Sequence, residues 1–589
     1  MTTLVDSWAR LTTGRVTRFP ALRGVFTPRS VVYGLVLIIL LAQVALPIAI
    51  LLFTSFKDAR PTDADFFSLS FTLENFRDAF ASGRLLSVTW TTVQFAGGST
   101  LVALALGTFL AWIVARTNAP FRNLVGVLTI VQMAVPGILV PVAWTFLASP
   151  KIGAINVAWR NLTGTEGTLF NVYSMQGLIL VNGLTMVPMV YLFVVTVFSS
   201  MNSSLEEAAE VSGASKLRAV RDISLPLAAP GIAAVAIMAL MRAWEAFEIP
   251  WFLGVNEKIF TYASEIYLRT STPPSNVGLV STYAVFMLLG AVVMIWWYDR
   301  FNQAGERYAV ISGKNFSSVR MDLGRWRVPV TILTFAVLTL VILLPLFMLL
   351  WMSLNPFFRQ FSWEAVTSLS LESYVAALQT PNIMQGFVNS LLVGVLASVG
   401  VLTLSTLAAW FSARRVPGGR LLYLLTSVPM ALPNVIVGVS FLWIFLITPL
   451  PIYSTHWALV IAYITIIIAV VSRLVSARML QISSELEEAA QVAGASFARA
   501  IWTIVVPLLS PALLAGALIT MVMSFRELQT TLYLAGPQTR TAAVVMFDMA
   551  GDGQFSTVAA FGIVTFAVLL VGLVGYNRLN ARMGLEGGL

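Results

Sequence analysis

Long apolar runs constrain the fold of this chain more than any other feature of its sequence. A helix needs about 20 apolar residues to cross the hydrocarbon core of a bilayer, and runs of that length follow one another here. Only 11% of the 589 residues are charged, against about 25% in an ordinary soluble domain. The polar residues needed to cover a water-exposed surface are missing, so the sequence predicts a multi-pass protein surrounded by membrane lipid.

About twelve such runs are present, and each is predicted to be a helix because the backbone must satisfy its own hydrogen bonds in lipid. The predicted spans cover residues 31–53, 91–115, 121–147, 174–199, 226–246 and 279–298 in the first half, and 328–353, 386–411, 421–446, 456–478, 506–527 and 556–576 in the second. The predicted fold class is an all-α membrane protein. Six spans per half make both halves enter from the same side, as parallel repeats.

Basic residues indicate which loops face the cytoplasm, because cytoplasmic loops carry an excess of Lys and Arg. This predicts a cytoplasmic N-terminal segment (1–30), a first membrane half (31–298), a cytoplasmic linker (299–327) and a second membrane half (328–589). The net charge of +9 falls in these loops, so no nucleic-acid partner is predicted. The inner loops hold Arg116, Arg122, Lys216, Arg218, Arg221, Arg414, Arg415, Arg420, Arg473, Arg478 and Arg499.

The composition argues against a metal site or a reactive thiol. The chain has no cysteine and one histidine, His456, in a short loop between two apolar runs. A zinc site needs several Cys or His ligands. We therefore predict no resident metal, no cofactor and no catalytic residue.

One polar segment occurs twice. Residues 205–215 read LEEAAEVSGAS and residues 486–496 read LEEAAQVAGAS, so nine of eleven positions are identical at a separation of 281 residues. Each copy lies on the predicted inner side, between the fourth and fifth span of its half. Because the surrounding spans differ between the halves, the repeat indicates a shared role beyond that of a connector.

The start of each copy fits a capping box, in which a serine and a glutamate three residues later bond reciprocally to the helix start. The predicted pairs are Ser203 with Glu206 and Ser484 with Glu487. We expect a short amphipathic helix to follow each of them, because alanine pairs favour helix.

The end of each copy carries a glycine, Gly213 or Gly494, where a helix is predicted to end in a left-handed turn. Since the capping box uses the first glutamate of each pair locally, the second one, Glu207 or Glu488, is left free to meet a partner. The alternative is an interfacial connector with no partner.

These residues resemble a known family pattern: EAA, three residues, G, nine residues, I, one residue, LP. The first half meets it at Glu207-Ala208-Ala209, Gly213, Ile223 and Leu225-Pro226. The second half meets it at Glu488-Ala489-Ala490, Gly494, Ile504 and Val506-Pro507, with valine in place of leucine.

Over nearly its whole length the chain resembles the membrane component of a type I binding-protein-dependent ABC importer, with two permease domains fused. The resemblance implies a bacterial cytoplasmic (inner) membrane location, an ABC ATPase partner in two copies and an external solute-binding protein. It also implies that the ATPase docks on Glu207, Ala208, Ala209, Gly213, Glu488, Ala489, Ala490 and Gly494.

The motor itself is not predicted within this chain. No G-x-x-x-x-G-K-[ST] phosphate loop is present, and Gly313-Lys314 is followed by Asn315. The chain is therefore predicted not to be an enzyme, with ATP hydrolysis assigned to a separate subunit.

Five charged residues lie on or just beyond two predicted spans, where charge is costly and usually faces a cavity or a partner. With the 281-residue offset, Glu245 aligns with Arg526, so these two unlike charges are expected to approach. An ion pair that locks the two halves and a polar lining or outer gate of a pathway both remain open. The five are Arg242, Glu245, Glu248, Arg526 and Glu527.

Proline pairs mark the third and ninth spans at matching positions. They are Pro136 with Pro141 and Pro429 with Pro433. Proline frees a backbone carbonyl and allows bending. A broken helix beside the pathway and simple kink packing are both compatible with these pairs.

The implied function is that of a permease that moves a delivered solute into the cytoplasm. The fused layout and residues 525–531 (FRELQTT) resemble the ferric-iron branch, and Glu245, Glu248 and Glu527 offer oxygen ligands for iron, free or chelated. Relatives in that branch carry thiamine, phosphonates or polyamines, which stay as alternatives. An ion-coupled secondary transporter and a membrane enzyme are rivals, which the repeated loop and the lack of a ligand cluster disfavour.

Overall fold

The computed structural model describes residues 28–582 apart from 62, 64–65, 202–207, 210, 214, 216–217, 219 and 307–320. Within these ranges the regular secondary structure is helical, with one isolated β-bridge between Thr117 and Met321. The prediction of an all-α membrane protein is confirmed.

Ten helices in the described ranges are long and apolar enough to cross a membrane, and an eleventh span results if one bent pair is counted. In the first half these spans are α1 (Pro28–Ser55), α3 (Arg84–Arg116), α7 (Met175–Ser199), η2 (Val220–Ser224) with α10 (Leu225–Trp244), and α12 (Val277–Glu306). In the second half they are α13 (Arg327–Leu338) with η6 (Thr339–Leu343) and α14 (Leu344–Ser353), α17 (Pro381–Ala413), α20 (His456–Met479), η8 (Ile501–Val505) with α23 (Val506–Arg526), and α26 (Phe555–Arg582).

Ten of the twelve predicted spans correspond to these long helices, and the other two, the third and the ninth, are broken. The third is divided into α4 (Arg122–Gln132) and α5 (Leu139–Ala148), and neither is long enough to cross alone. The ninth bends by 106° between residues 419–431 and α19 (Asn434–Ile447). Both breaks fall at the predicted proline pairs, so a broken helix, rather than a kink alone, is confirmed there.

The two halves repeat the same order of elements. α7 begins at Met175 and α20 at His456, which are 281 residues apart, and η2 and η8 are separated by the same offset. Both η2 and η8 are π-helices that stand two residues before a proline, Pro226 or Pro507. Proline has no N–H to donate to the carbonyl four residues earlier. A π-helix, in which each N–H bonds to the carbonyl five residues earlier, lets that carbonyl find another donor.

Glycines allow the central helices of each half to pack closely. A Cβ added at Gly107 of α3 would lie 2.7 Å from Val190 of α7, and one at Gly183 of α7 would lie 2.6 Å from Val102 of α3. In the second half, a Cβ at Gly400 of α17 would lie 2.4 Å from Ile464 of α20. Small residues at such crossings are how helices associate where lipid removes the hydrophobic driving force.

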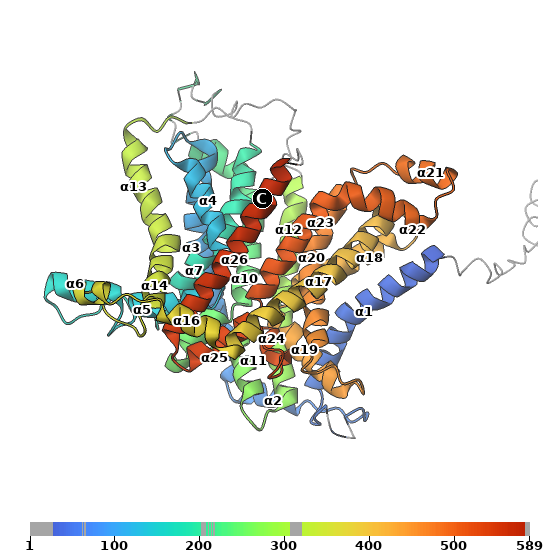
Figure 1. The fold of residues 1–589 in the computed structure, drawn as a ribbon, viewed down its shortest axis with the longest axis horizontal. Coiled ribbons are helices and arrows are strands. Elements are labelled where there is room, and N and C mark those ends of the chain that lie inside the picture. The colour runs from blue at the N-terminus through green and yellow to red at the C-terminus, as the bar shows by residue number, and fades with distance from the viewer. Residues whose placement is uncertain are drawn as a thin grey trace, which may run out of the picture.

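The first span of each half lies against the other half. α1 packs beside α17, α18 (Gly419–Ser427), α19 and α20, and α14 packs beside α5 (Figure 1). An aromatic contact between the halves lies at each of these two packing sites. The ring centroids are 5.4 Å apart for Tyr33 and Phe411, and 4.5 Å apart for Phe146 and Phe358. The halves are therefore interlocked rather than merely adjacent.

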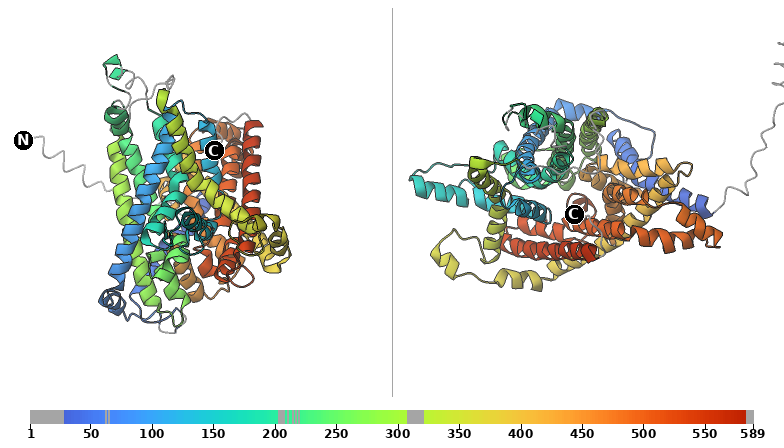
Figure 2. Two further views of the ribbon diagram at one scale, coloured as in Figure 1. Left: turned by 90° about the vertical axis from the view of Figure 1, so that its left-hand side faces the viewer. Right: turned by 90° about the horizontal axis from the view of Figure 1, so that it is seen from above.

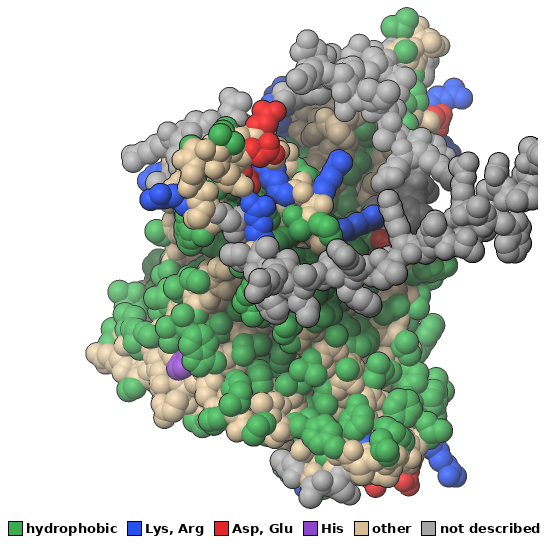
Figure 3. Space-filling model, turned by 90° about the vertical axis from the view of Figure 1, so that its right-hand side faces the viewer, with side chains coloured by type: hydrophobic (Ala, Val, Ile, Leu, Met, Phe, Trp, Pro, Cys, Tyr) green, Lys and Arg blue, Asp and Glu red, His purple; other side chains and the backbone are tan. Residues whose placement is uncertain are grey.

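The long helices run side by side (Figure 2). Charged side chains gather at the end that carries α21 (Glu485–Val492) and α22 (Phe497–Ala500), above a broad apolar band (Figure 3). The start of α1 lies at this same end, where Arg29 Nη2 donates to Gln491 Oε1 at 2.9 Å. The opposite end carries α2 (Glu74–Ala81), α11 (Tyr262–Ser271) and α25 (Ala542–Gly551) (Figure 1).

The described parts of the predicted linker are attached to the first half. α12 continues to Glu306, past the predicted end of its span at 298. After the break in the described ranges, Met321 N donates to Arg116 O at 2.9 Å, and Asn118 Nδ2 donates to Asp322 Oδ1 at 2.6 Å. The linker thus ends on the loop that follows α3.

Gly418 offers a test of the interlocked first span. Its φ is +82°, and an added Cβ would lie 2.1 Å from Tyr33 Oη of α1. Gly418→Ala is expected to cost about 1–2 kcal/mol for the left-handed backbone and about 1–3 kcal/mol more for the displaced tyrosine. Thermal unfolding in detergent measures the sum.

Gly83→Ala is the matched control, because Gly83 has φ of +62° and open space around its missing Cβ. It should lose only the backbone contribution of about 1–2 kcal/mol. Equal melting temperatures for the two variants would contradict the contact between α1 and the second half.

Candidate docking loops and a charged cluster between the halves

The candidate docking loop of the second half is a short helix that ends in a glycine turn, as predicted. α21 ends at Val492, and Gly494 has φ of +87°. Gly494 N donates to Gln491 O and Ala495 N donates to Ala490 O, both at 2.9 Å, which is the bonding of a Schellman turn. Gly213 has φ of +90°, so the first copy also turns left-handed at its glycine.

The predicted capping box of the second half is wrong. Ser484 has helical angles and its side chain makes no cap bond. Glu487 instead accepts hydrogen bonds from Trp410 Nε1 at 2.8 Å and from Arg414 Nη2 at 2.6 Å. Glu487 is only 4% exposed, and a buried carboxylate requires charged and hydrogen-bonding partners more than a helix start requires a cap.

The remaining predicted docking residues divide by exposure. Glu488, Ala489, Gly494, Ala208 and Gly213 are exposed. Ala490 and Ala209 are half-buried under their loops. The predictions for Ser203, Glu206 and Glu207 fall outside the described residues.

An exposed valine in each loop went unnoticed in the sequence. Val211 is 90% exposed and Val492 is 91% exposed, and they occupy the same position of the repeat. Each stands near the turn glycine of its loop, and an isolated apolar side chain of this kind suits the core of a protein interface. The signal that would have revealed them is their identity in both copies, since a solvated loop needs no valine.

The five intramembrane charges come together, though not in the predicted pairing. Glu245 forms an ion pair with Arg242 of its own helix end rather than with Arg526. The reason is geometric: residues three apart on one helix are neighbours. Arg526 Nη1 instead donates to the carbonyl of Met133 at 2.5 Å, which crosses from the second half to the first.

Both helix breaks contact this charged cluster. Met133 lies between α4 and α5, and a Cβ added at Gly137 in the same break would lie 3.3 Å from Glu248 Oε1. In the second half, Asn434 begins α19 immediately after its break, and its Nδ2 donates to Glu527 Oε2 at 2.8 Å. Irregular backbone at membrane depth is tolerated where protein groups satisfy it, and here the partners are the charged residues.

The charges also act on one another across the interface. Arg242 lies within electrostatic range of Glu245, Glu248 and Glu527, and Arg526 lies within range of Glu248 and also of the like charge of Arg242. Two arginines and three glutamates give the cluster a formal charge of −1 when all are ionised. In the described residues no group of three Asp, Glu, His or Cys is arranged to hold a metal ion.

Next to these charges, aromatic rings from the two halves pack together in a cluster. Its centre is Phe547 of α25, surrounded by rings from the segment that follows α10 and from α11. Centroid distances to Phe547 are 6.1 Å from Phe247, 6.1 Å from Trp251, 5.5 Å from Phe252 and 5.9 Å from Tyr267. Nothing in the sequence pattern reveals that Phe247 has a partner from the other half.

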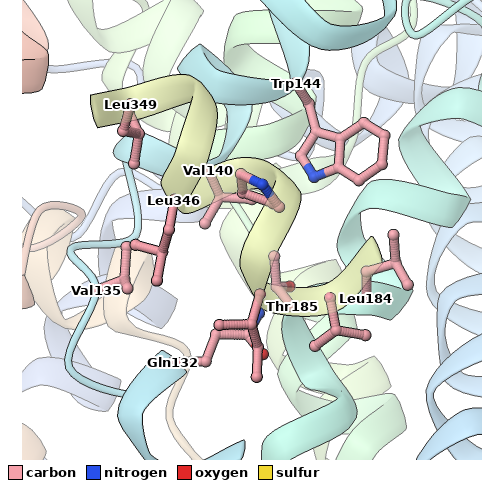
Figure 4. A pocket seen from close by; sticks show the side chains of 11 residues that line it. Gln132, Val135, Val140, Trp144, Leu184, Thr185, Leu346 and Leu349 are labelled. Atoms are coloured by element: carbon pink, nitrogen blue, oxygen red, sulfur yellow. The ribbon is translucent and has the colours of Figure 1, made fainter. Parts of the chain in front are cut away.

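A small pocket lies beside the first break, between α5, α7 and α14 (Figure 4). Its volume is about 10 Å³, which holds at most one water. Gln132 and Thr185 are its polar lining, and Trp144 and Leu346 are among its apolar lining. A larger open cleft of about 490 Å³ lies toward the α2 and α11 end, where Arg84 and Arg269 both pair with Glu265.

The interlocked helical halves, each with its own loop, define a two-domain membrane permease. Residues 103–306 and 401–585 both match the family described as "Binding-protein-dependent transport system inner membrane component". The chain belongs to this family and carries two of its domains fused, which confirms the resemblance seen in the sequence.

Individual relatives are distant. A ferric transport system permease protein, FbpB of Actinobacillus pleuropneumoniae, is 23% identical over 68% of this chain, and the match spans 57% of that protein. The protein named as ABC transporter permease y4fN in Sinorhizobium fredii is 21% identical over 81% of this chain and 84% of its own length. One named as a 2-aminoethylphosphonate transport system permease in Salmonella typhi is 28% identical over 41% of this chain and 81% of its own length.

A cysteine pair tests the aromatic contact between the halves. The chain has no cysteine, so Phe247→Cys combined with Phe547→Cys provides the only thiols. Side chains this close should be joined by a short bismaleimide. A protease site engineered at Gly313 then separates the halves, and a crosslinked sample should still migrate as one polypeptide on a denaturing gel.

Each single cysteine variant is the control and should yield two fragments. A pair at Phe247 and Val571, which is 71% exposed on α26, should also stay uncrosslinked. Two fragments from the Phe247 and Phe547 pair under all conditions would contradict the cluster.

Proposed function

We propose that this chain is the membrane permease of an ATP-driven importer that moves a solute, delivered by an external binding protein, into the cytoplasm. The observation that carries the proposal is the pair of family domains, each with its own exposed loop at one end of the molecule. Because the two loops have nearly the same sequence, we expect each to bind one copy of the same motor subunit. The ATPase is assigned to a separate partner, and this chain to no enzymatic step.

The helices provide a path from the loops to the charged cluster. Each loop leads through a π-helix into a single helix, α10 or α23, whose far end carries Arg242 or Arg526. At 1.5 Å per residue, a helix such as α23 spans about 30 Å. A displacement of both loops by the motor therefore reaches the cluster through continuous helices, as alternating access requires.

We assign Arg242, Glu245, Glu248, Arg526 and Glu527 to a polar gate on this path. The support is their position: they lie between the halves, touch both helix breaks and adjoin the aromatic cluster. Opening toward the α2 and α11 end must separate Arg526 from Met133 and Phe547 from Phe247. The external binding protein is assigned to that end, and the cytoplasm to the end with α21 and the start of α1.

Ferric iron, free or chelated, is the cargo we propose. The support is a relative, matched over 68% of this chain, that is named for ferric transport. The alternative cargo is a phosphonate, since another relative is named for 2-aminoethylphosphonate. Thiamine and polyamines remain further alternatives, and an ion-coupled transporter is disfavoured by the paired loops.

Joint replacement of Glu207 and Glu488 by alanine tests the docking assignment. Loss of both acids is expected to lower uptake at least tenfold, equivalent to about 1.4 kcal/mol in motor affinity. Uptake in vesicles and copurification of the ATPase are measured together. Glu485→Ala is the matched control, because Glu485 is exposed on the same helix but lies outside the family pattern.

Normal uptake and normal ATPase copurification by the double variant would overturn the docking assignment. Cargo is tested separately, by uptake of radioactive ferric iron and 2-aminoethylphosphonate with the intact importer. Uptake of the phosphonate alone would reject iron and leave the docking assignment standing.

A further inference from the structure

A buried ion pair ties the docking helix of the second half to α17. Glu487 of α21 accepts from Arg414 Nε at 3.1 Å, from Arg414 Nη2 at 2.6 Å and from Trp410 Nε1 at 2.8 Å. Arg414 Nη1 also donates to the carbonyl of Ile482, at 3.0 Å, in the segment before α21. One arginine thus holds the docking loop at two points.

The adjacent acids of the loop point in different directions. Glu487 is buried, whereas Glu488 is exposed, because successive residues are about 100° apart around a helix. The outward acid is the one assigned to the motor. The inward acid has its hydrogen bonds satisfied within this chain.

The residues that hold Glu487 also occur in the first half. Residues 111–116 read AWIVAR and residues 409–414 read AWFSAR, so tryptophan and arginine recur at the inner end of α3 and α17. Arg116 Nη1 donates to the carbonyl of Met201 at 3.3 Å, as Arg414 does to that of Ile482. Met201 and Ile482 are 281 residues apart, which is the offset of the two loops.

We infer that Glu487, Arg414 and Trp410 are positioning residues that make α21 and α17 move as one body. α21 is already joined through η8 to α23, and the ion pair adds a second connection, to a different span. α17 packs against both α20 and α23. A motor that moves α21 therefore moves the core of the second half, rather than pulling on α23 alone. This inference rests on the proposed function for its motor.

The tether itself is tested on the isolated full-length chain, without any motor. A spin label on Val492→Cys reports the mobility of α21, since the chain has no other cysteine and this position is 91% exposed. Glu487→Gln should increase label mobility in lipid nanodiscs. Trp410→Phe keeps an aromatic ring but removes the indole N–H and its hydrogen bond to Glu487, and should give a smaller increase.

Glu485→Gln is the control and should leave the spectrum unchanged, because Glu485 is exposed on the same helix. Arg414→Gln combined with Glu487→Gln should be no more mobile than Arg414→Gln alone, since that single variant already loses the ion pair with Glu487 as well as the bond to the Ile482 carbonyl. An unchanged spectrum for Glu487→Gln, or equal changes for Glu485→Gln, would overturn the tether.

The role of the tether is tested in the assembled importer. Glu487→Gln should retain ATPase copurification and ATP hydrolysis within about twofold, while uptake per ATP hydrolysed falls at least tenfold, or about 1.4 kcal/mol in coupling. A purely structural role predicts instead that assembly, hydrolysis and uptake fall together, and that result would overturn the inference. Unchanged uptake per ATP would overturn it as well.

Failure of the proposed function is distinguishable from failure of this inference. If the Glu207 and Glu488 double variant still binds the ATPase normally, the docking assignment fails. The spin-label result on the isolated chain stands or falls independently of that outcome.

Discussion

The need to pair every backbone N–H and C=O within lipid governs the whole structure. Each unpaired group at membrane depth costs several kcal/mol, so the spans are helices. The exceptions occur at prolines, where a donor is missing. At some of these prolines the chain re-pairs through a π-helix, as before Pro226 and Pro507, and at others it breaks. At the breaks, protein side chains take over: Arg526 binds the Met133 carbonyl, and Thr530 Oγ1 binds the Asn434 carbonyl at 3.0 Å.

Features set by local chain chemistry could be predicted from the sequence. Apolar length predicted the helices, the repeat predicted two matching loops, and glycine predicted the left-handed turns at Gly213 and Gly494. Features set by distant neighbours could not. Glu487 fits a capping box in sequence, but Arg414, 73 residues away, binds it instead. The partner of Arg526 is a backbone carbonyl 393 residues away, and a carbonyl carries no sequence signal.

The charged cluster and the broken helices depend on each other. A break exposes polar backbone that needs partners, and a charge within the membrane needs a polar environment. When the breaks and the charges lie together at the interface between the halves, the charged side chains bind the exposed backbone, and the backbone supplies the polar environment that the charges need. Because Arg526 and Glu527 belong to the second half and Met133 and Glu248 to the first, the arrangement holds in only one relative position of the halves. Rotation of one half against the other changes the pairing, which suits a gate.

The two ends of the molecule differ in how far the halves have diverged. At the docking end, nine of eleven residues are identical, and the arginine contacts to Met201 and Ile482 are repeated. At the far end, the first half has the cleft in which Glu265 pairs with two arginines. The second half instead has an ion pair between Arg540 and Asp548, at 3.2 Å, and a hydrogen bond between His456 Nε2 and Asn389 Oδ1, at 2.9 Å. Under the proposed function, two copies of one motor subunit require matching loops, whereas a solute and its binding protein impose no such symmetry on the far end.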